Sequence, residues 1–135
     1  MSPSPSSSTL QDIGKLLLRV VLGVLILFHG MDKMLHGIDT IKSMVSSTGL
    51  PGFFAYGVYL GEVLAPIMVI SGFHARLGAA LIAINMIIAI LLAHTGELLS
   101  LSAHGGWLPE LQGMYLVTAI AIACLGPGRF SLNQR

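Results

Sequence analysis

The sequence predicts an all-α protein, a four-helix transmembrane bundle. Of its 135 residues, 54% are hydrophobic and only 10% are charged, whereas a soluble domain carries roughly 25% charged residues. So few charged groups cannot cover a surface that faces water, and we therefore expect the lipid bilayer to surround the chain. The net charge of +1 comes without a clustered basic patch, which argues against nucleic-acid binding.

The chain opens with a Ser/Pro-rich head at 1–12, which cannot bury apolar surface and is expected to be disordered. An apolar segment at about 13–35 follows and is expected to form the first helix. Because no A-x-A-like cleavage site follows its apolar core, we interpret this segment as a retained membrane span rather than a signal peptide.

Three further apolar segments are expected to be helices, at about 53–73, 77–94 and 110–125. A membrane span takes about 20 residues, and the first of these segments reaches that length with Glu62 as its only charge. The last segment must stop at the sequence "GPG", residues 126–128, because proline and glycine end helices. The four-helix domain therefore covers 13–128, and residues 129–135 form a short cytoplasmic tail.

The distribution of basic residues predicts the topology. Four spans put both termini and the link at 73–76 on one side of the membrane. That side carries five basic residues: Lys15, Arg19, Arg76, Arg129 and Arg135. The opposite side carries Lys33 and Lys42. An excess of Lys and Arg marks the cytoplasmic side, so both termini are predicted to be cytoplasmic in a multi-pass protein of the cytoplasmic (inner) membrane.

Each predicted helix also carries one ionisable side chain in its outer half: His29, Glu62, His94 and Glu110. At a rise of 1.5 Å per residue, Glu62 lies about 13 Å and His29 about 10 Å below the outer boundary, with the other two near the edge. Ionisable groups inside a bilayer are costly and usually face a bundle interior. We predict a polar intramembrane site for a quinone or a proton. The alternative is that Glu62 and His29 only lock two helices together, and that His94 and Glu110 are interfacial.

A proline follows this glutamate after one helical turn. Pro66 cannot donate a hydrogen bond to the carbonyl oxygen of Glu62. We therefore expect the second span to bend near Glu62 and to leave a free carbonyl beside the carboxyl group.

No metal site is predicted, because the four ionisable residues come from four helices and lack ligand pairs spaced by three or four residues. On the predicted cytoplasmic side of the membrane, the candidate functional residues are basic: Arg19, Arg76 and Arg129. We expect Arg19 and Arg76 either to bind lipid headgroups or to hold the termini in place.

Several segments together resemble the DoxX family. They are "LLLRVVLGVLILFHGMDKM" at 16–34, Glu62, "GFHARLGAALIAINMIIAILLAH" at 72–94, Glu110 and "GPGRFSLN" at 126–133. The resemblance covers nearly the whole chain from Ile13 onward. Two departures stand in the tail, namely Phe130 where many relatives have Tyr and Asn133 where many have Asp.

The resemblance implies a small bacterial or archaeal membrane protein of four helices that is associated with quinone-linked redox systems. It implies no established catalytic residues, and no catalytic set is identified here. We expect a subunit or accessory protein of a membrane redox system that interacts with a quinone. Its partners beyond the bilayer are expected among redox subunits or copies of the same chain. Two alternatives stay open: a protein that handles or conducts a small solute or metal ion, and an anchor for a soluble oxidoreductase.

Overall fold

The computed structural model describes residues 5–93 and 95–135. Within these residues the chain is all-helical, which confirms the predicted class, and it has no strand beyond one bridge between Leu101 and Trp107. Three helical stretches are long and apolar enough to cross a membrane: Ser8–His36, Gly52–Ser71 and Ala75–Ala93. A shorter apolar helix, Glu110–Leu125, follows them. The protein is therefore a membrane protein with the lipid bilayer as its environment.

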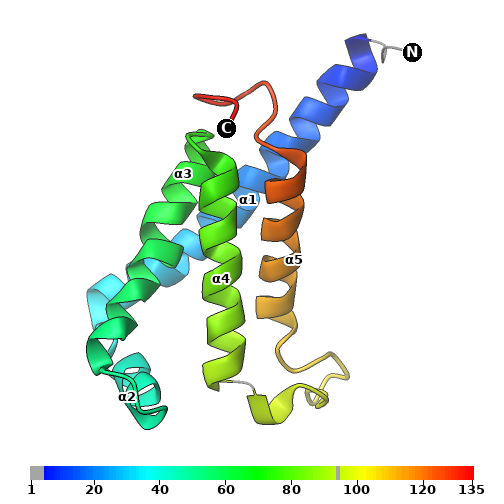
Figure 1. The fold of residues 1–135 in the computed structure, drawn as a ribbon. Coiled ribbons are helices and arrows are strands. Elements are labelled where there is room, and N and C mark those ends of the chain that lie inside the picture. Colours follow the sequence, from blue (N-terminus) through cyan, green and yellow to red (C-terminus); the bar gives the residue numbers. More distant parts are fainter. Residues whose placement is uncertain (1–4, 94) are drawn as a thin grey trace.

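The first helix, α1 (Pro5–His36), begins earlier than the predicted span. The predicted disordered head at 1–12 lies outside the described residues up to residue 4, and its remainder is helical. At 32 residues α1 is about 48 Å long, well beyond the roughly 30 Å of hydrocarbon in a bilayer. Its polar first turns therefore extend past the bundle, as Figure 1 shows.

The second span is not one regular helix. It consists of a 3₁₀-helix, η1 (Gly52–Gly57), a π-helix, η2 (Leu60–Leu64), and a short α-helix, α3 (Ala65–Ser71). Glu62 lies inside the π-helix, and Pro66 is the second residue of α3, which follows it. The regular backbone is thus interrupted at the predicted place, because a proline N–H is missing where the α-helical pattern needs one.

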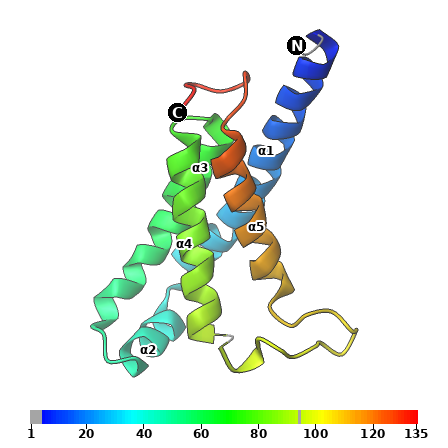
Figure 2. The same ribbon diagram turned by 45° about the vertical axis from the view of Figure 1, so that its right-hand side comes forward.

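Two long antiparallel helices complete the bundle. A tight turn with Gly72 in the left-handed region (φ 77°) leads into α4 (Ala75–Ala93), and α5 (Glu110–Leu125) follows a long loop. These two helices lie side by side in both views (Figures 1 and 2). The bundle core comprises buried side chains from α1, α3, α4 and α5, including Leu22, Ile26, Val69, Ile82 and Ile122. The start of α1 and the C-terminal tail lie at the same end of the bundle.

The sequence interpretation missed one helix. Residues Asp39–Ser47 form α2, which lies across the end of the bundle opposite the termini. Ile38 and Val45 are buried there against Ala55 of η1. α2 therefore packs against η1 and α4 at the end of the bundle away from the termini.

Candidate functional site

A buried ion pair stands at the centre of the candidate site. Glu62 is only 5% exposed, and its Oε1 lies 2.7 Å from the Nζ of Lys33. Lys33 belongs to α1 and Glu62 to η2, so the pair joins two separate spans. The ion-pair partner of Glu62 is thus Lys33 and not His29, which lies one helical turn earlier on the same face of α1.

The backbone at Glu62 is shaped by close packing against α1. A Cβ atom built on Gly30 would overlap the carbonyl oxygen of Glu62, and one on Gly23 would lie 3.1 Å from that of Pro66. α1 can therefore approach this span so closely only because glycines face it. Since Pro66 offers no N–H to the Glu62 carbonyl, that oxygen is turned toward Gly30 instead. This approach brings Lys33, three residues further along α1, within reach of the Glu62 carboxylate.

The ion pair lines a cavity of about 370 Å³. Its walls are mostly apolar and come from α1, α2, η1, η2, α4 and α5. Six polar side chains line it: His29, Lys33, Glu62, Asn85, Gln112 and Tyr115. We call this space the outer cavity. Its combination of apolar walls and a few convergent polar groups is typical of a small-molecule site.

Two of these polar groups meet across the cavity. The ring of His29 stands edge-on to the ring of Tyr115, with 5.9 Å between centroids and 76° between planes. His29 comes from α1 and Tyr115 from α5, so the contact joins these two helices beside the cavity. On the opposite wall a Cβ at Gly61 would overlap the side chain of Asn85, which shows that α4 packs directly against η2.

Of the other two residues of the predicted outer layer, the structure describes only Glu110, which does not line this cavity. His94 lies outside the described residues. Glu110 is exposed in the first turn of α5, and its carboxylate lies against Gly106 in the preceding loop. A carboxylate there is stabilised by the helix dipole, which is the interfacial alternative stated above.

Sequence reasoning missed Lys33, Asn85, Gln112 and Tyr115 as members of the site. One signal pointed to Lys33, because it follows His29 by four residues and must share its helical face. No comparable signal marked Tyr115, whose position depends on how α5 packs against α1. Among the described residues, no group of three or more His, Cys, Asp and Glu side chains is placed to hold a metal ion.

At the opposite end, Arg19 is buried and only 1% exposed. Its Nε donates to the carbonyl of Val69 (2.9 Å), and Nη2 donates to that of Ile70 (3.1 Å). Its Nη1 donates to the carbonyls of Pro127 (2.6 Å) and Phe130 (2.8 Å). Arg19 thus caps the C-terminal end of α3 and ties the tail to α1. Of the two roles expected from the sequence, binding lipid headgroups or holding the termini in place, these bonds give it the second.

The other two inner basic residues stay at the surface. Arg129 is exposed, and its backbone N–H donates to Oδ1 of Asp12 (3.1 Å). Its Nε lies 3.8 Å from the other oxygen of that carboxylate. Arg76 is also exposed, and its guanidinium group lies over Gly126 at the end of α5.

Comparison with known proteins identifies the family. The family model named DoxX matches residues 14–95. The chain belongs to the DoxX family. It is also 31% identical over 122 residues to a protein of Bacillus subtilis (strain 168) named "Putative oxidoreductase CatD", which covers 90% of this chain and 86% of that protein. No solved structure matches the chain. The resemblance noted in the sequence is therefore confirmed at the level of the family.

Proposed function

We propose that this DoxX-family protein is a four-span protein of the cytoplasmic membrane that serves a redox system and binds a quinone or quinol in the outer cavity. The redox assignment is supported by the family and by the oxidoreductase named among its relatives. The choice of ligand is supported by the chemistry of the cavity. The observation that carries it is the Lys33–Glu62 ion pair on the wall of a mostly apolar space that also presents His29 and Tyr115.

The proposed topology uses α5 as the fourth span. α5 has 16 residues and is about 24 Å long, so it is short for the bilayer, and a short span is accommodated by local thinning. The first described turn of α1 and the tail share one end of the bundle, which four spans require. Reporter fusions at the C-terminus and within residues 97–106 test this topology. A cytoplasmic signal from the fusion within 97–106 would contradict it.

A quinone headgroup is a flat apolar ring with two carbonyl acceptors and no donor. The outer cavity meets this need, because the Lys33 ammonium has three N–H groups and directs one toward Glu62. The Tyr115 hydroxyl and the His29 ring supply further groups on the α1–α5 side. Its volume of about 370 Å³ falls within the range of small-ligand sites. When bound, a quinone supplies two-electron, two-proton redox chemistry.

The ion pair also prepares the cavity for either redox form. The Glu62 carboxylate, 2.7 Å from the Lys33 Nζ, holds this hydrogen-bond donor in place for a quinone carbonyl. A quinol hydroxyl donates rather than accepts, and the carboxylate of Glu62 is an acceptor for it. The imidazole ring of His29, which also lines the cavity, can both donate and accept a hydrogen bond.

Binding of a short-tailed benzoquinone to the detergent-purified protein tests the proposal. The decisive variant is Lys33→Gln/Glu62→Gln, which removes both charges and leaves two amides able to bond each other. Replacing both members of a buried pair is often neutral for stability. We expect this variant to fold with wild-type stability and to bind the quinone at least tenfold more weakly, as should Tyr115→Phe to a lesser degree. Lys42→Gln, a charge change outside the cavity, is the matched control and should bind normally.

The competing interpretation is that the pair only locks α1 to η2. In that case the double variant keeps its quinone affinity within twofold of wild type. That result, obtained with a folded protein, would refute the proposed function.

A further inference from the structure

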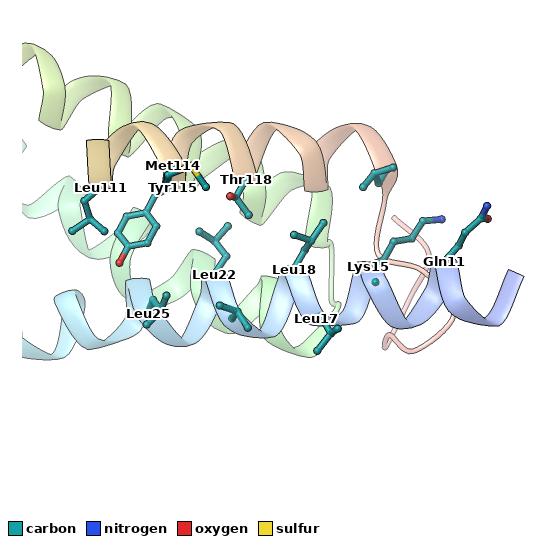
Figure 3. A pocket seen from close by; sticks show the side chains of 13 residues that line it. Gln11, Lys15, Leu17, Leu18, Leu22, Leu25, Leu111, Met114, Tyr115 and Thr118 are labelled. Atoms are coloured by element: carbon teal, nitrogen blue, oxygen red, sulfur yellow. The ribbon is translucent and has the colours of Figure 1, made fainter. Parts of the chain in front are cut away.

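A second hollow runs along the side of the bundle, between α1 and α5. It has a volume of about 1000 Å³ and mostly aliphatic walls. Figure 3 shows Leu18 and Leu22 pointing from α1 toward α5, and Tyr115 and Thr118 pointing from α5 toward α1. We call this hollow the lateral groove. Its inner end is reached at Lys15, whose side chain lies beside the apolar row in Figure 3.

A basic pocket of about 300 Å³ adjoins this inner end. It is lined by three cationic side chains, Lys15, Arg76 and Arg129, and by one carboxylate, Asp12. Lys15 and Leu125 line both the basic pocket and the lateral groove, so the two spaces are adjacent. A polar, positively charged pocket thus lies beside the end of an apolar groove.

The charges of the basic pocket are incompletely neutralised. Asp12 is held by Arg129, through the backbone N–H and the guanidinium group. In the described part of the chain, neither Lys15 nor Arg76 has a carboxylate within ion-pair distance. The turn at the end of α5 positions both, since the Arg76 guanidinium packs over Gly126 and the Lys15 side chain packs against Gly128.

We propose that the basic pocket and the lateral groove together hold one anionic phospholipid of the inner leaflet. The phosphate binds between Lys15 and Arg76, which supply charge-assisted hydrogen bonds to its oxygens. One acyl chain lies in the groove against Leu18 and Leu22. From Lys15 to Leu25 the groove follows α1 for about 15 Å, which is half of the roughly 30 Å hydrocarbon core. The groove therefore matches the depth of a single leaflet.

Charge complementarity favours a lipid over a second copy of the chain. In a symmetric dimer about an axis along the membrane normal, the same surface of each subunit meets its equivalent. Such a dimer through this face would bring two positively charged pockets together. An anionic headgroup instead neutralises the pocket, and basic residues near an anionic membrane surface attract such lipids.

Glycine at position 14 provides a clean test of the groove. Gly14 lines the lateral groove, and a Cβ atom built on it would meet nothing within 4 Å. Leucine is also a better helix former than glycine. Gly14→Leu therefore fills the inner end of the groove without disturbing the packing of α1.

Native mass spectrometry of the full chain in mild detergent measures the binding. Phosphatidylglycerol is titrated against phosphatidylcholine with identical acyl chains, and inorganic phosphate serves as the headgroup alone. We expect the wild type to retain phosphatidylglycerol selectively. Lys15→Gln/Arg76→Gln should weaken that binding roughly 30-fold, the effect expected for two basic side chains at an anionic surface. Gly14→Leu should weaken it at least fivefold, and Lys42→Gln, at the other end of the bundle, should change it less than twofold.

Three results would overturn the proposal. Equal retention of the two lipids would exclude recognition of an anionic headgroup. Tight binding of inorganic phosphate, with lipid binding unchanged in Gly14→Leu, would show a free-anion site instead. A change of oligomeric state in Gly14→Leu without a change in lipid binding would show that a second copy covers the groove. Should the double charge variant fail to fold, as judged by thermal unfolding, Gly14→Leu decides the question alone.

Discussion

Arg19 offers the sharpest test of how the bundle is held together. Its guanidinium group is bonded to main-chain carbonyl oxygens of two segments that lie far from it in the sequence. Substitution by methionine keeps much of the length and the apolar stem of the side chain but removes every donor. The carbonyls at the end of α3 and in the tail then lose their partner in the interior of the protein.

The structure gives the size of the effect. The bonds to Val69 and Pro127 are buried, whereas those to Ile70 and Phe130 are partly buried and can be replaced by water. A hydrogen bond to a charged group contributes about 1.5–3 kcal/mol. The two buried bonds alone therefore predict that Arg19→Met lowers the free energy of unfolding by about 3–6 kcal/mol. Arg19→Lys should lose about half as much, because an ammonium keeps the charge but cannot reach all four oxygens.

Unfolding in mixed micelles with increasing SDS, followed by circular dichroism, measures this difference. Arg129→Gln is the matched control, because Arg129 is exposed and its guanidinium contact with Asp12 is long, at 3.8 Å. Exposed pairs contribute at most about 1 kcal/mol. An Arg19→Met protein within 1 kcal/mol of wild type would refute the capping role assigned to this arginine.

Three further predictions concern the region around Glu62. Gly30→Ala places a methyl group against the Glu62 main chain and should destabilise the protein by about 1–3 kcal/mol in the same assay. Gly14→Ala is the control and should be neutral or stabilising, so equal effects of the two substitutions would contradict the close approach of α1. Glu62→Gln alone leaves the Lys33 charge unpaired, and it should lower the free energy of unfolding by about 2 kcal/mol more than Lys33→Gln/Glu62→Gln does. A double-mutant cycle measures this difference, and additive effects would show that the two side chains do not interact. Pro66→Ala restores a backbone donor and should increase amide protection across residues 60–66 in hydrogen exchange, and unchanged protection would show that the proline does not cause the π-helix.

The features that depend on one residue type were predictable from the sequence. A glutamate in an apolar membrane segment needs an ion-pair or hydrogen-bond partner. A proline four residues later removes the N–H that would bond its carbonyl, and this effect does not depend on how the helix packs. The structure accordingly places Glu62 inside a π-helix that ends two residues before Pro66, and it buries the carboxylate against the Lys33 side chain. Both statements follow from local chemistry and needed no knowledge of neighbouring helices.

The partner of Glu62 was not predictable in the same way. Counting residues along a helix gives the depth of a side chain but not the direction in which the helix turns it. His29 has the depth nearer that of Glu62, yet it is the Nζ of Lys33 that lies 2.7 Å from the carboxylate. Tyr115 could not be found at all by depth, since its place in the outer cavity depends on the packing of α5.

Two other features, helix α2 and the contacts of Arg19, were not predicted from the sequence, for different reasons. α2 is short and mostly polar, and no helix was predicted between residues 35 and 53, although Ile38, Ile41 and Val45 repeat with helical spacing and pack on one side. The role of Arg19 depends on Pro127, which is 108 residues away in the chain. No pattern within the first helix points to a contact at such a distance.

The central claim is that a quinone binds in the outer cavity, and photo-crosslinking tests it most directly. The purified protein is irradiated with an azido-quinone, and the labelled peptides are identified by mass spectrometry. We predict labelling within residues 29–33, 60–64 and 111–115, displaced by unlabelled quinone and lost in Lys33→Gln/Glu62→Gln. Labelling that spreads over the lipid-facing helix surfaces, or that persists undiminished with excess quinone or in the double variant, would contradict the claim.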